Sequence, residues 1–286
     1  MKKINYVVCA TPRCGSTYFC SVLEGAGLLT KISPISNSYE AYNSNLSYKI
    51  YPQVRSLREI FSSLFDEIRL RNNVSGFKVH YHQLRGLYNV LLKSNKLCNC
   101  VYRRKNLFPE GTNFIWLIRR NRVRQAISYY IANETNIWTR TKKNRTVFGK
   151  DVPFSVIKIA DFSSKIKLDN KHWKAFFKRN NISPLIIYYE DFIKDPDKYI
   201  SSVASFLGVS LLKNVSIKSK FLKQSTSVNE AWERRYSGHK TLEFYFYLFH
   251  KFGFMEYVYS ISFVFKNKCR ACKRTIYLIK SILMLK

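Results

Sequence analysis

The sequence predicts an α/β protein with a central, mostly parallel sheet flanked by helices in three layers. Short apolar runs of strand length alternate along the chain with longer amphipathic stretches of helical spacing. This alternation is typical of parallel sheets that are covered on both faces. The chain has 286 residues, 46% of them hydrophobic, which is enough for one large core.

The first predicted strand, residues 4–9, leads into the turn Ala10-Thr-Pro-Arg-Cys-Gly-Ser-Thr-Tyr18 and a predicted helix over residues 16–26. A strand, a glycine turn and a helix start form an anion site, because the free N–H groups and the helix dipole point to one place. The turn is P-loop-like, although it lacks the lysine that G-x-x-x-x-G-K-[ST] requires after Gly15. Arg13 supplies a cation instead. An ordinary strand-to-helix turn is the alternative interpretation.

The next segment, residues 28–45, has no clear periodicity and is predicted to be an irregular stretch lying over the turn. It contains Glu40, the only acidic residue between Glu24 and Glu59. The elements predicted after it are a helix over residues 56–70, a short buried strand over residues 76–82 and a helix over residues 83–92.

The clearest strand, residues 113–118, runs directly into a basic helix start predicted at residues 119–124. Because ligands of parallel sheets bind at the carboxyl ends of the strands, this helix start is expected beside the first turn. Arg120 and Ser128 would then hold a second phosphate. Positive charge at a helix N-terminus is unfavourable by up to about 1 kcal/mol per residue, which points to a bound anion. A solvated basic helix start is the alternative.

The second half of the chain continues the alternation. Its predicted elements are a basic loop over residues 136–153, a helix over 162–179, a strand over 184–189 followed by Glu190-Asp191, and a helix over 197–207 that Gly208 ends.

A tail over residues 241–286 is aromatic, basic and predicted to be helical. The predicted domains are therefore an α/β domain over 1–240 and a C-terminal extension over 241–286. Charged residues interrupt the tail before about 20 apolar residues accumulate, so no membrane span is expected. The tail either packs on the core as a helix pair or lies on a membrane surface.

The formal net charge is +31, from 49 basic and 18 acidic side chains. Such a field favours polyanions: nucleotides, nucleic acid or an acidic membrane surface. Seven cysteines, an odd number, favour free thiols in a reducing compartment. No signal peptide is visible, so we expect a cytoplasmic protein. Peripheral contact with the inner face of the membrane through the tail is the alternative to packing of the tail on the core. Zinc binding by Cys98, Cys100, Cys269 and Cys272 is disfavoured, because the paired C-x-x-C spacing is absent.

The strand followed by Thr11-x-Arg13-x-Gly15-Ser16-Thr17, with Arg120 and Ser128 eight residues apart, resembles the two-part nucleotide site of sulfotransferases. The closer resemblance is to the bacterial trehalose 2-sulfotransferase family. Four stretches in the same order carry it, within about residues 4–236. They are residues 11–19, Ser38-Tyr-Glu40-Ala-Tyr42, residues 119–128 continuing to Thr135-Asn-Ile-Trp138, and Gln224 with Trp232, Arg235 and Tyr236.

The resemblance implies transfer of a sulfuryl group from 3′-phosphoadenosine-5′-phosphosulfate (PAPS) to a carbohydrate hydroxyl, without a metal, by a homodimer. The acceptor would be trehalose-like, or part of a glycan or glycolipid. The 5′-phosphosulfate would be held by Arg13, Cys14, Gly15, Ser16 and Thr17, and the 3′-phosphate by Arg120 and Ser128. The acceptor would contact Asn37, Ser38, Tyr39, Glu40, Ala41, Tyr42 and Asn43, with Glu40 as the general base. Arg13 would also stabilise charge on the leaving oxygen.

The sequence departs from this family at two places. Pro12 and Cys14 stand where the trehalose enzyme has polar residues, which leaves the acceptor open. Lys78-x-His80 has the spacing of a pair in cytosolic animal sulfotransferases, in which the histidine is the base. Glu40 is preferred as the base and His80 is the competing candidate, with His82 as a further one. A packing role at the strand end is the alternative for both histidines.

Two other functions compete with sulfotransfer. A non-catalytic basic protein would bind nucleic acid or acidic membrane surfaces, but it needs no pair of separate phosphate pockets, and no specific nucleic-acid partner is expected. A P-loop kinase would use Glu190 and Asp191 for magnesium, but the missing lysine disfavours it.

Overall fold

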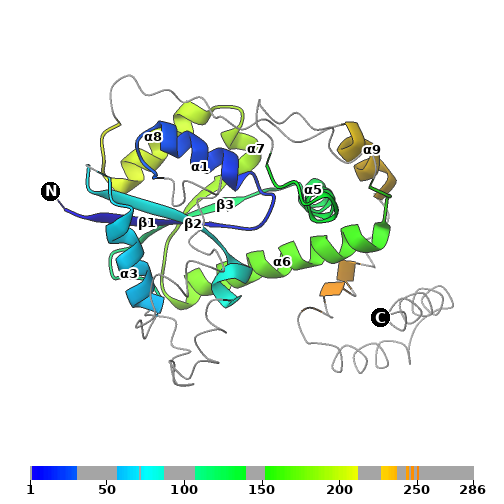
Figure 1. The fold of residues 1–286 in the computed structure, drawn as a ribbon, viewed down its shortest axis with the longest axis horizontal. Coiled ribbons are helices and arrows are strands. Elements are labelled where there is room, and N and C mark those ends of the chain that lie inside the picture. Colours follow the sequence, from blue (N-terminus) through cyan, green and yellow to red (C-terminus); the bar gives the residue numbers. More distant parts are fainter. Residues whose placement is uncertain are drawn as a thin grey trace.

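The structure is a computed structural model and describes residues 2–30, 57–70, 72–86, 107–139, 152–211 and 227–236, with residues 243, 244, 246, 247 and 250. Its strands and helices alternate along the chain (Figure 1). In chain order they are β1 (Ile4–Ala10), α1 (Ser16–Gly25), α3 (Leu57–Glu67), β2 (Val74–His80), β3 (Asn113–Ile118), α5 (Arg122–Thr135), α6 (Val156–Arg179), β4 (Leu185–Tyr188), α7 (Tyr189–Phe192), α8 (Pro196–Leu207) and α9 (Ser227–Tyr236).

The described strands form one parallel sheet in the order β2-β1-β3-β4. Side chains of β1 alternate between the two faces of the sheet, and both sets are buried. Tyr6, Val8 and Ala10 join one hydrophobic cluster, whereas Val7 and Cys9 join another. A strand that is apolar on both faces has to be covered on both, which confirms the predicted α/β class.

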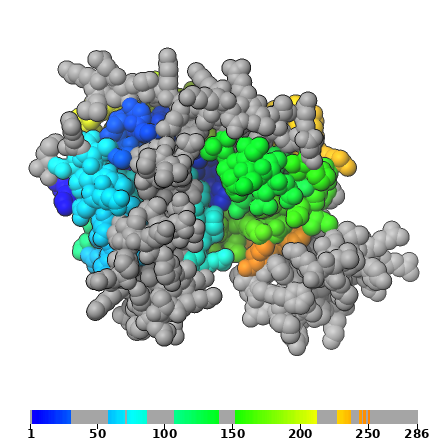
Figure 2. Space-filling view, viewed as in Figure 1, coloured from blue at the N-terminus to red at the C-terminus, as the bar shows by residue number. Residues whose placement is uncertain are grey.

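Helices α1 and α8 cover one face of the sheet, and α3 and α6 cover the other (Figure 1). These layers explain why the helices are amphipathic: Leu23 and Val203 face one side of the sheet, and Phe65 and Trp173 face the other. A third cluster lies between α5, α6 and α9. In the space-filling view, the green surface of α5 and the cyan residues of α3 lie on opposite sides of one face (Figure 2).

Capping residues account for helix boundaries that periodicity alone misplaced. Helix α6 begins at Val156 instead of Phe162, because the Ser155 side chain caps it by accepting the Lys158 N–H. Asp195 caps α8 in the same way, and Gly208 ends that helix with a φ of 67°, as predicted.

Helix α9 was not predicted. Its sequence SVNEAWERRY is mostly polar, and Asn229 and Tyr236 are its buried residues.

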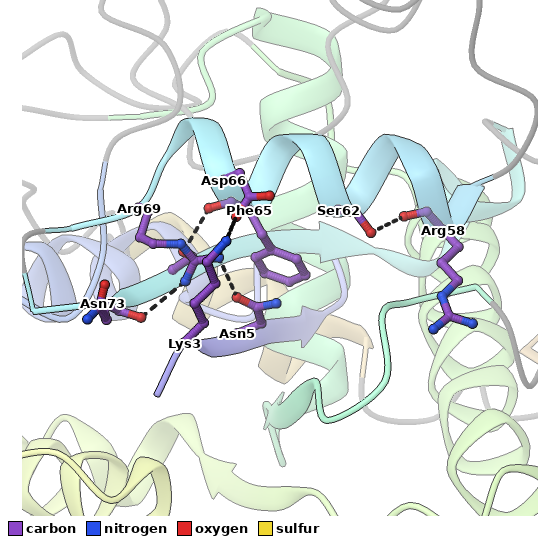
Figure 3. Close-up of polar contacts among 9 residues, drawn as sticks. Lys3, Asn5, Arg58, Ser62, Phe65, Asp66, Arg69 and Asn73 are labelled. Atoms are coloured by element: carbon purple, nitrogen blue, oxygen red, sulfur yellow. Dashed lines mark hydrogen bonds and ion pairs between the residues drawn. The ribbon is translucent and has the colours of Figure 1, made fainter. Parts of the chain in front are cut away.

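A polar network ties α3 to the amino ends of β1 and β2, at the edge of the sheet opposite the first turn (Figure 3). Arg69 donates to the Asn5 side chain at 3.1 Å, to the Asn73 carbonyl oxygen at 3.1 Å and to Asp66 at 2.9 Å. Lys3 reaches the same Asp66 carboxylate at 3.0 Å. The network has a structural role, and it leaves the carboxyl edge of the sheet for ligands.

Candidate active site

The turn between β1 and α1 lies at the carboxyl edge of the sheet, where parallel α/β folds bind ligands. It contains two residues with left-handed backbone, Arg13 with φ 63° and Gly15 with φ 90°. Among the described residues, no side chain caps α1. The first N–H groups of α1 and its positive dipole end are therefore available to an anion.

Gly15 is required by packing as well as by backbone conformation. A Cβ atom at this position would lie 2.2 Å from Cδ2 of Tyr189, the first residue of α7. The Arg119 guanidinium also lies over the Tyr189 ring, 5.2 Å from the ring centroid. The sequence predicted Gly15 for close approach to a phosphate. The structure adds that the Tyr189 ring fills the space beside it.

The basic stretch at the start of α5 meets the turn, as the sheet topology predicted. Arg13 Nε donates to Ser128 Oγ at 3.0 Å, and its Nη1 donates to the Trp138 carbonyl oxygen. Gln125 Nε2 donates to Thr11 Oγ1 at 2.8 Å and to the Pro12 carbonyl oxygen at 2.7 Å. The structure therefore brings Arg13 and Ser128 together, through contacts that span more than a hundred residues of sequence.

Three basic side chains, Arg13, Arg119 and Lys78, lie in or beside the turn. Arg119 Nη1 donates to the Arg13 carbonyl oxygen at 3.2 Å. Lys78 is 2% exposed, and its Nζ lies 3.4 Å from Thr17 Oγ1. Burial, and then the nearby Arg119 charge, lower the pKa of Arg13 to about 10. Burial likewise lowers the pKa of Arg119. Charges that repel one another away from water are stabilised by an anion between them.

Arg120 occupies a different environment from Arg13. Its guanidinium forms a two-bond fork with Asp191, at 2.7 and 2.6 Å, and lies 3.9 Å from the centroid of the Tyr188 ring. Glu190 accepts the backbone N–H groups of Arg120 and Asn121 at 3.0 and 3.2 Å. Both acids considered for magnesium therefore bind the start of α5. Among the described residues, no hydrogen bond joins Arg120 to Ser128.

Two more arginines of this stretch also meet carboxylates. Arg122 pairs with Glu243 at 2.8 Å, and Arg124 pairs with Glu233 at 2.5 Å. The chain thus balances the charges of Arg120, Arg122 and Arg124 with its own acids. The basic helix start is therefore not by itself evidence of a bound anion. The evidence that remains is the cluster of half-buried Arg13 and Arg119 with buried Lys78.

Of the candidate bases, His80 and His82 belong to the described residues, and Glu40 does not. His80 is the last residue of β2 and pairs in register with Ala10, the last residue of β1, so it is buried beside the turn. The His82 ring stacks on His80 with centroids 5.7 Å apart, and its Nδ1 lies 3.7 Å from an Asp169 oxygen. Glu40 and the other predicted acceptor residues, 37–43, lie outside the described residues.

The sequence placed the stretch that contains Arg119 and Gln125 beside the turn but gave these two residues no role of their own, and Tyr189 and Trp173 were not predicted as parts of the site. Trp173 Nε1 donates to the Ala10 carbonyl oxygen at 3.0 Å from the opposite face of the sheet. Polar or aromatic residues inside amphipathic helices carry no signal of the atoms they reach. Only Arg119 had a signal, as a cation directly after a strand.

The described part of the chain has neither a metal-binding cluster nor a helix that could span a membrane. It contains no cluster of three or more His, Cys, Asp or Glu side chains that would hold a metal ion. Cys9, Cys14 and Cys20 are buried free thiols, and the four cysteines considered for zinc lie outside the described residues. None of the described helices is both long and apolar enough to cross a bilayer.

Comparison with known proteins identifies the family. The family model of the Stf0 sulphotransferase matches residues 5–239. No curated protein sequence matches the chain significantly.

Solved structures similar to this chain include a sulfotransferase from Alicyclobacillus acidocaldarius, at 12% identity and a TM-score of 0.43, covering 85% of this chain and 95% of that one. A sulfotransferase domain from the curacin biosynthetic pathway has 13% identity and a TM-score of 0.42, covering 75% and 77%. Mouse sulfotransferase SULT7A1, complexed with PAP, has 15% identity and a TM-score of 0.36, covering 82% and 64%.

The family match confirms the resemblance that the first turn and the Arg120–Ser128 spacing predicted. It extends over most of the 286 residues, so the chain belongs to the Stf0 sulphotransferase family and transfers a sulfuryl group from PAPS.

Proposed function

We propose that this sulfotransferase transfers the sulfuryl group to a carbohydrate hydroxyl and binds the 5′-phosphosulfate of PAPS at the turn between β1 and α1. The cluster of half-buried Arg13 and Arg119 and buried Lys78 around the start of α1 is the observation that carries the proposal. A doubly charged phosphosulfate would offset the repulsion within that cluster. Membership of a sulfotransferase family disfavours the alternative, a non-catalytic protein that binds nucleic acid or membranes.

The residues of the turn have distinct roles in this proposal. The N–H groups of Gly15, Ser16 and Thr17 bind phosphosulfate oxygens at the helix start, and Cys14 lines the site, with its own N–H donating to the Thr11 carbonyl oxygen within the turn. Arg13 stabilises the negative charge that develops on the bridging oxygen as the sulfur–oxygen bond breaks. Because Arg13 is already held by Ser128 and Trp138, it does not have to reorganise during the reaction.

Arg120 and Ser128 are proposed to bind the 3′-phosphate. Asp191 uses one N–H of each terminal nitrogen of Arg120, so the fork keeps the guanidinium plane fixed and leaves further donors for a phosphate. Ser128 retains its hydroxyl hydrogen as a donor while its oxygen accepts from Arg13.

The acceptor hydroxyl has to lose its proton as its oxygen attacks sulfur. Glu40 is the preferred base, with residues 37–43 contacting the sugar, and His80 is the competing base because of its place beside Ala10. A positioned base contributes roughly 10²–10⁴ in rate. The proposal requires no metal.

The proposal also includes an oligomeric state, a cellular location and a division into domains. We expect a homodimer in the cytoplasm, with residues 1–240 as the catalytic domain. The extension, residues 241–286, would touch the inner face of the membrane. Buried free Cys9, Cys14 and Cys20 are consistent with a reducing compartment.

The acceptor is tested with an activity assay. The purified protein is incubated with PAPS and either trehalose, other sugars, lipid-linked glycans or a simple alcohol, and sulfated products are identified by mass spectrometry. The proposal predicts a sulfated sugar or glycan. Sulfation of the simple alcohol alone would contradict the carbohydrate assignment.

A further inference from the structure

The carbonyl oxygens of Pro12 and Arg13, one on each side of the Arg13 Cα, both accept hydrogen bonds from side chains elsewhere in the chain. Gln125, on α5, donates to the Pro12 carbonyl oxygen at 2.7 Å. Arg119, which follows β3, donates to the Arg13 carbonyl oxygen at 3.2 Å. Between these two bonds, Arg13 adopts a φ of 63°.

A left-handed backbone is unfavourable for an arginine, because its Cβ crowds the following carbonyl. Such a conformation persists where the surroundings fix it, and it is found preferentially at functional sites. Rotation of Arg13 to a negative φ would turn both flanking peptide groups. The bonds to Gln125 and Arg119 could then not both be kept, and the guanidinium would move away from Ser128 Oγ.

Gln125 is poorly explained as a residue that serves stability alone. Its side chain is fully buried, and its amide nitrogen uses both N–H groups on the turn, on Thr11 Oγ1 and the Pro12 carbonyl oxygen. Its buried Oε1 atom has no hydrogen-bond partner within the described ranges. That acceptor without a partner lowers stability, whereas the two donated bonds satisfy acceptors of the turn, so the favourable contribution of this amide lies in its contacts with the turn.

We propose that Gln125 and Arg119 are positioning residues of this sulfotransferase: they hold Arg13 in its left-handed conformation, so that its guanidinium is in place before the nucleotide arrives. Neither has to touch PAPS to do so. This inference rests on the proposed role of Arg13 in binding PAPS. It assigns a function to the two polar residues of the site that the sequence did not single out.

The test substitutes Gln125→Met, which keeps the length of the side chain and removes both donors. Affinity for adenosine 3′,5′-bisphosphate is measured by calorimetry. Loss of a preorganised charge contact is expected to weaken binding about tenfold. Tyr130→Phe is the matched control on the same helix, because it removes a partly buried hydrogen bond, 2.8 Å long, to the Pro153 carbonyl oxygen, away from the turn. It is expected to bind like the wild type.

A double-mutant cycle separates positioning from general loosening of the fold. If Gln125 acts through Arg13, Gln125→Met weakens binding in the wild type but has no further effect in an Arg13→Ala background. If Gln125→Met does not fold, Gln125→Glu, which keeps the side-chain shape, replaces it in the cycle.

The outcomes distinguish this inference from the proposed function. Wild-type affinity in Gln125→Met, or equal losses in both backgrounds, would overturn the positioning role while leaving the PAPS site standing. Wild-type affinity in Arg13→Ala would overturn both, because Arg13 would then not contribute to the site.

Discussion

Arg13 combines three features that are each unfavourable in a folded protein. Its guanidinium is partly removed from water, it lies beside a second half-buried arginine, Arg119, and its backbone is left-handed. A left-handed non-glycine residue costs on the order of 1–3 kcal/mol. This combination costs stability, as expected for a residue of the proposed anion site.

The backbone strain at Arg13 is tested by comparing two substitutions. Arg13→Ala and Arg13→Gly both remove the guanidinium, so both are expected to weaken binding of adenosine 3′,5′-bisphosphate about tenfold or more. Only glycine accepts a φ of 63° without strain. Arg13→Gly should therefore be more stable than Arg13→Ala by about 1 kcal/mol in chemical unfolding, the reverse of the usual order. Greater stability of the alanine variant would contradict the strain.

The identity of the base is decided by a second pair of substitutions. Glu40→Gln and His80→Asn each remove one candidate. With saturating PAPS, loss of the true base is expected to lower kcat by roughly 10²–10⁴ and to leave bisphosphate affinity unchanged. We expect that loss in Glu40→Gln. A large fall confined to His80→Asn would assign the base to His80, and unchanged kcat in both would exclude both.

At the residue scale, the sequence predicted groups that have a local signature and missed those that act at a distance. Gly15 and Arg13 sit in a recognisable strand–turn–helix. Gln125 and Tyr189 reach the turn from α5 and α7, and nothing in their own neighbourhoods indicates this contact. The carboxylate partner of Arg120 was visible as Glu190-Asp191, but their pairing depends on β4 lying beside β3.

Among the elements, the start of α1 depends most on its neighbours. Gly15 provides a turn without a Cβ, and the Tyr189 ring of α7 occupies the vacant space. Helix α5 depends on several other elements: Asn121 caps it, and Glu233 of α9 accepts from Asn121 Nδ2 at 2.6 Å. Helix α9 escaped prediction because its apolar side is short: Val228, Trp232 and Tyr236 pack into the third cluster, and the rest of its sequence is mostly polar.

The packing between α1 and α7 is tested with Gly15→Ala. The added methyl group meets the Tyr189 ring in addition to a backbone φ of 90°, so the unfolding free energy should fall by about 1–3 kcal/mol or more. Gly208→Ala is the matched control, since it has a φ of 67° with no atom within 4 Å of the added carbon. Gly15→Ala should cost more than Gly208→Ala, and Tyr189→Ala should remove the excess. Equal costs for the two glycines would show that the ring moves freely.

For the whole molecule, the alternation of strands and helices predicted the sheet and its layers, because each buried strand requires cover on both faces. The charge of +31 predicted polyanions in general but not one site. The positions of the carboxylates in the fold decide which arginine charges are neutralised, and the composition does not give these positions. Acids are scarce, with 18 in the chain, so those that pair with cations carry much of the pH dependence of stability.

Acid should destabilise the protein through these carboxylates. Burial alone would raise the pKa of Asp161, but its bonds with His250 and Lys165 lower the pKa overall, and Glu233 is lowered similarly by Asn121 and Arg124. A carboxyl whose pKa is lowered by folding stabilises the protein above its unfolded pKa, and that stability is lost as pH falls. The thermal midpoint should therefore decline below about pH 4.5.

Asp161→Asn serves as the comparison for this pH profile. It should be less stable than the wild type at neutral pH and should lose less on acidification, because one titrating carboxyl is gone. A profile that stays flat between about pH 5 and pH 3, or identical acid slopes in both proteins, would contradict this assignment.

The proposed function requires a nucleotide site with two phosphate pockets and not only a general positive field. Calorimetry of adenosine 3′,5′-bisphosphate, with AMP and ATP as controls at physiological salt, tests this most directly. We predict micromolar binding of the bisphosphate and much weaker binding of AMP, because AMP lacks the 3′-phosphate assigned to Arg120 and Ser128. Equally weak binding of all three nucleotides would contradict the account and show that charge alone attracts them.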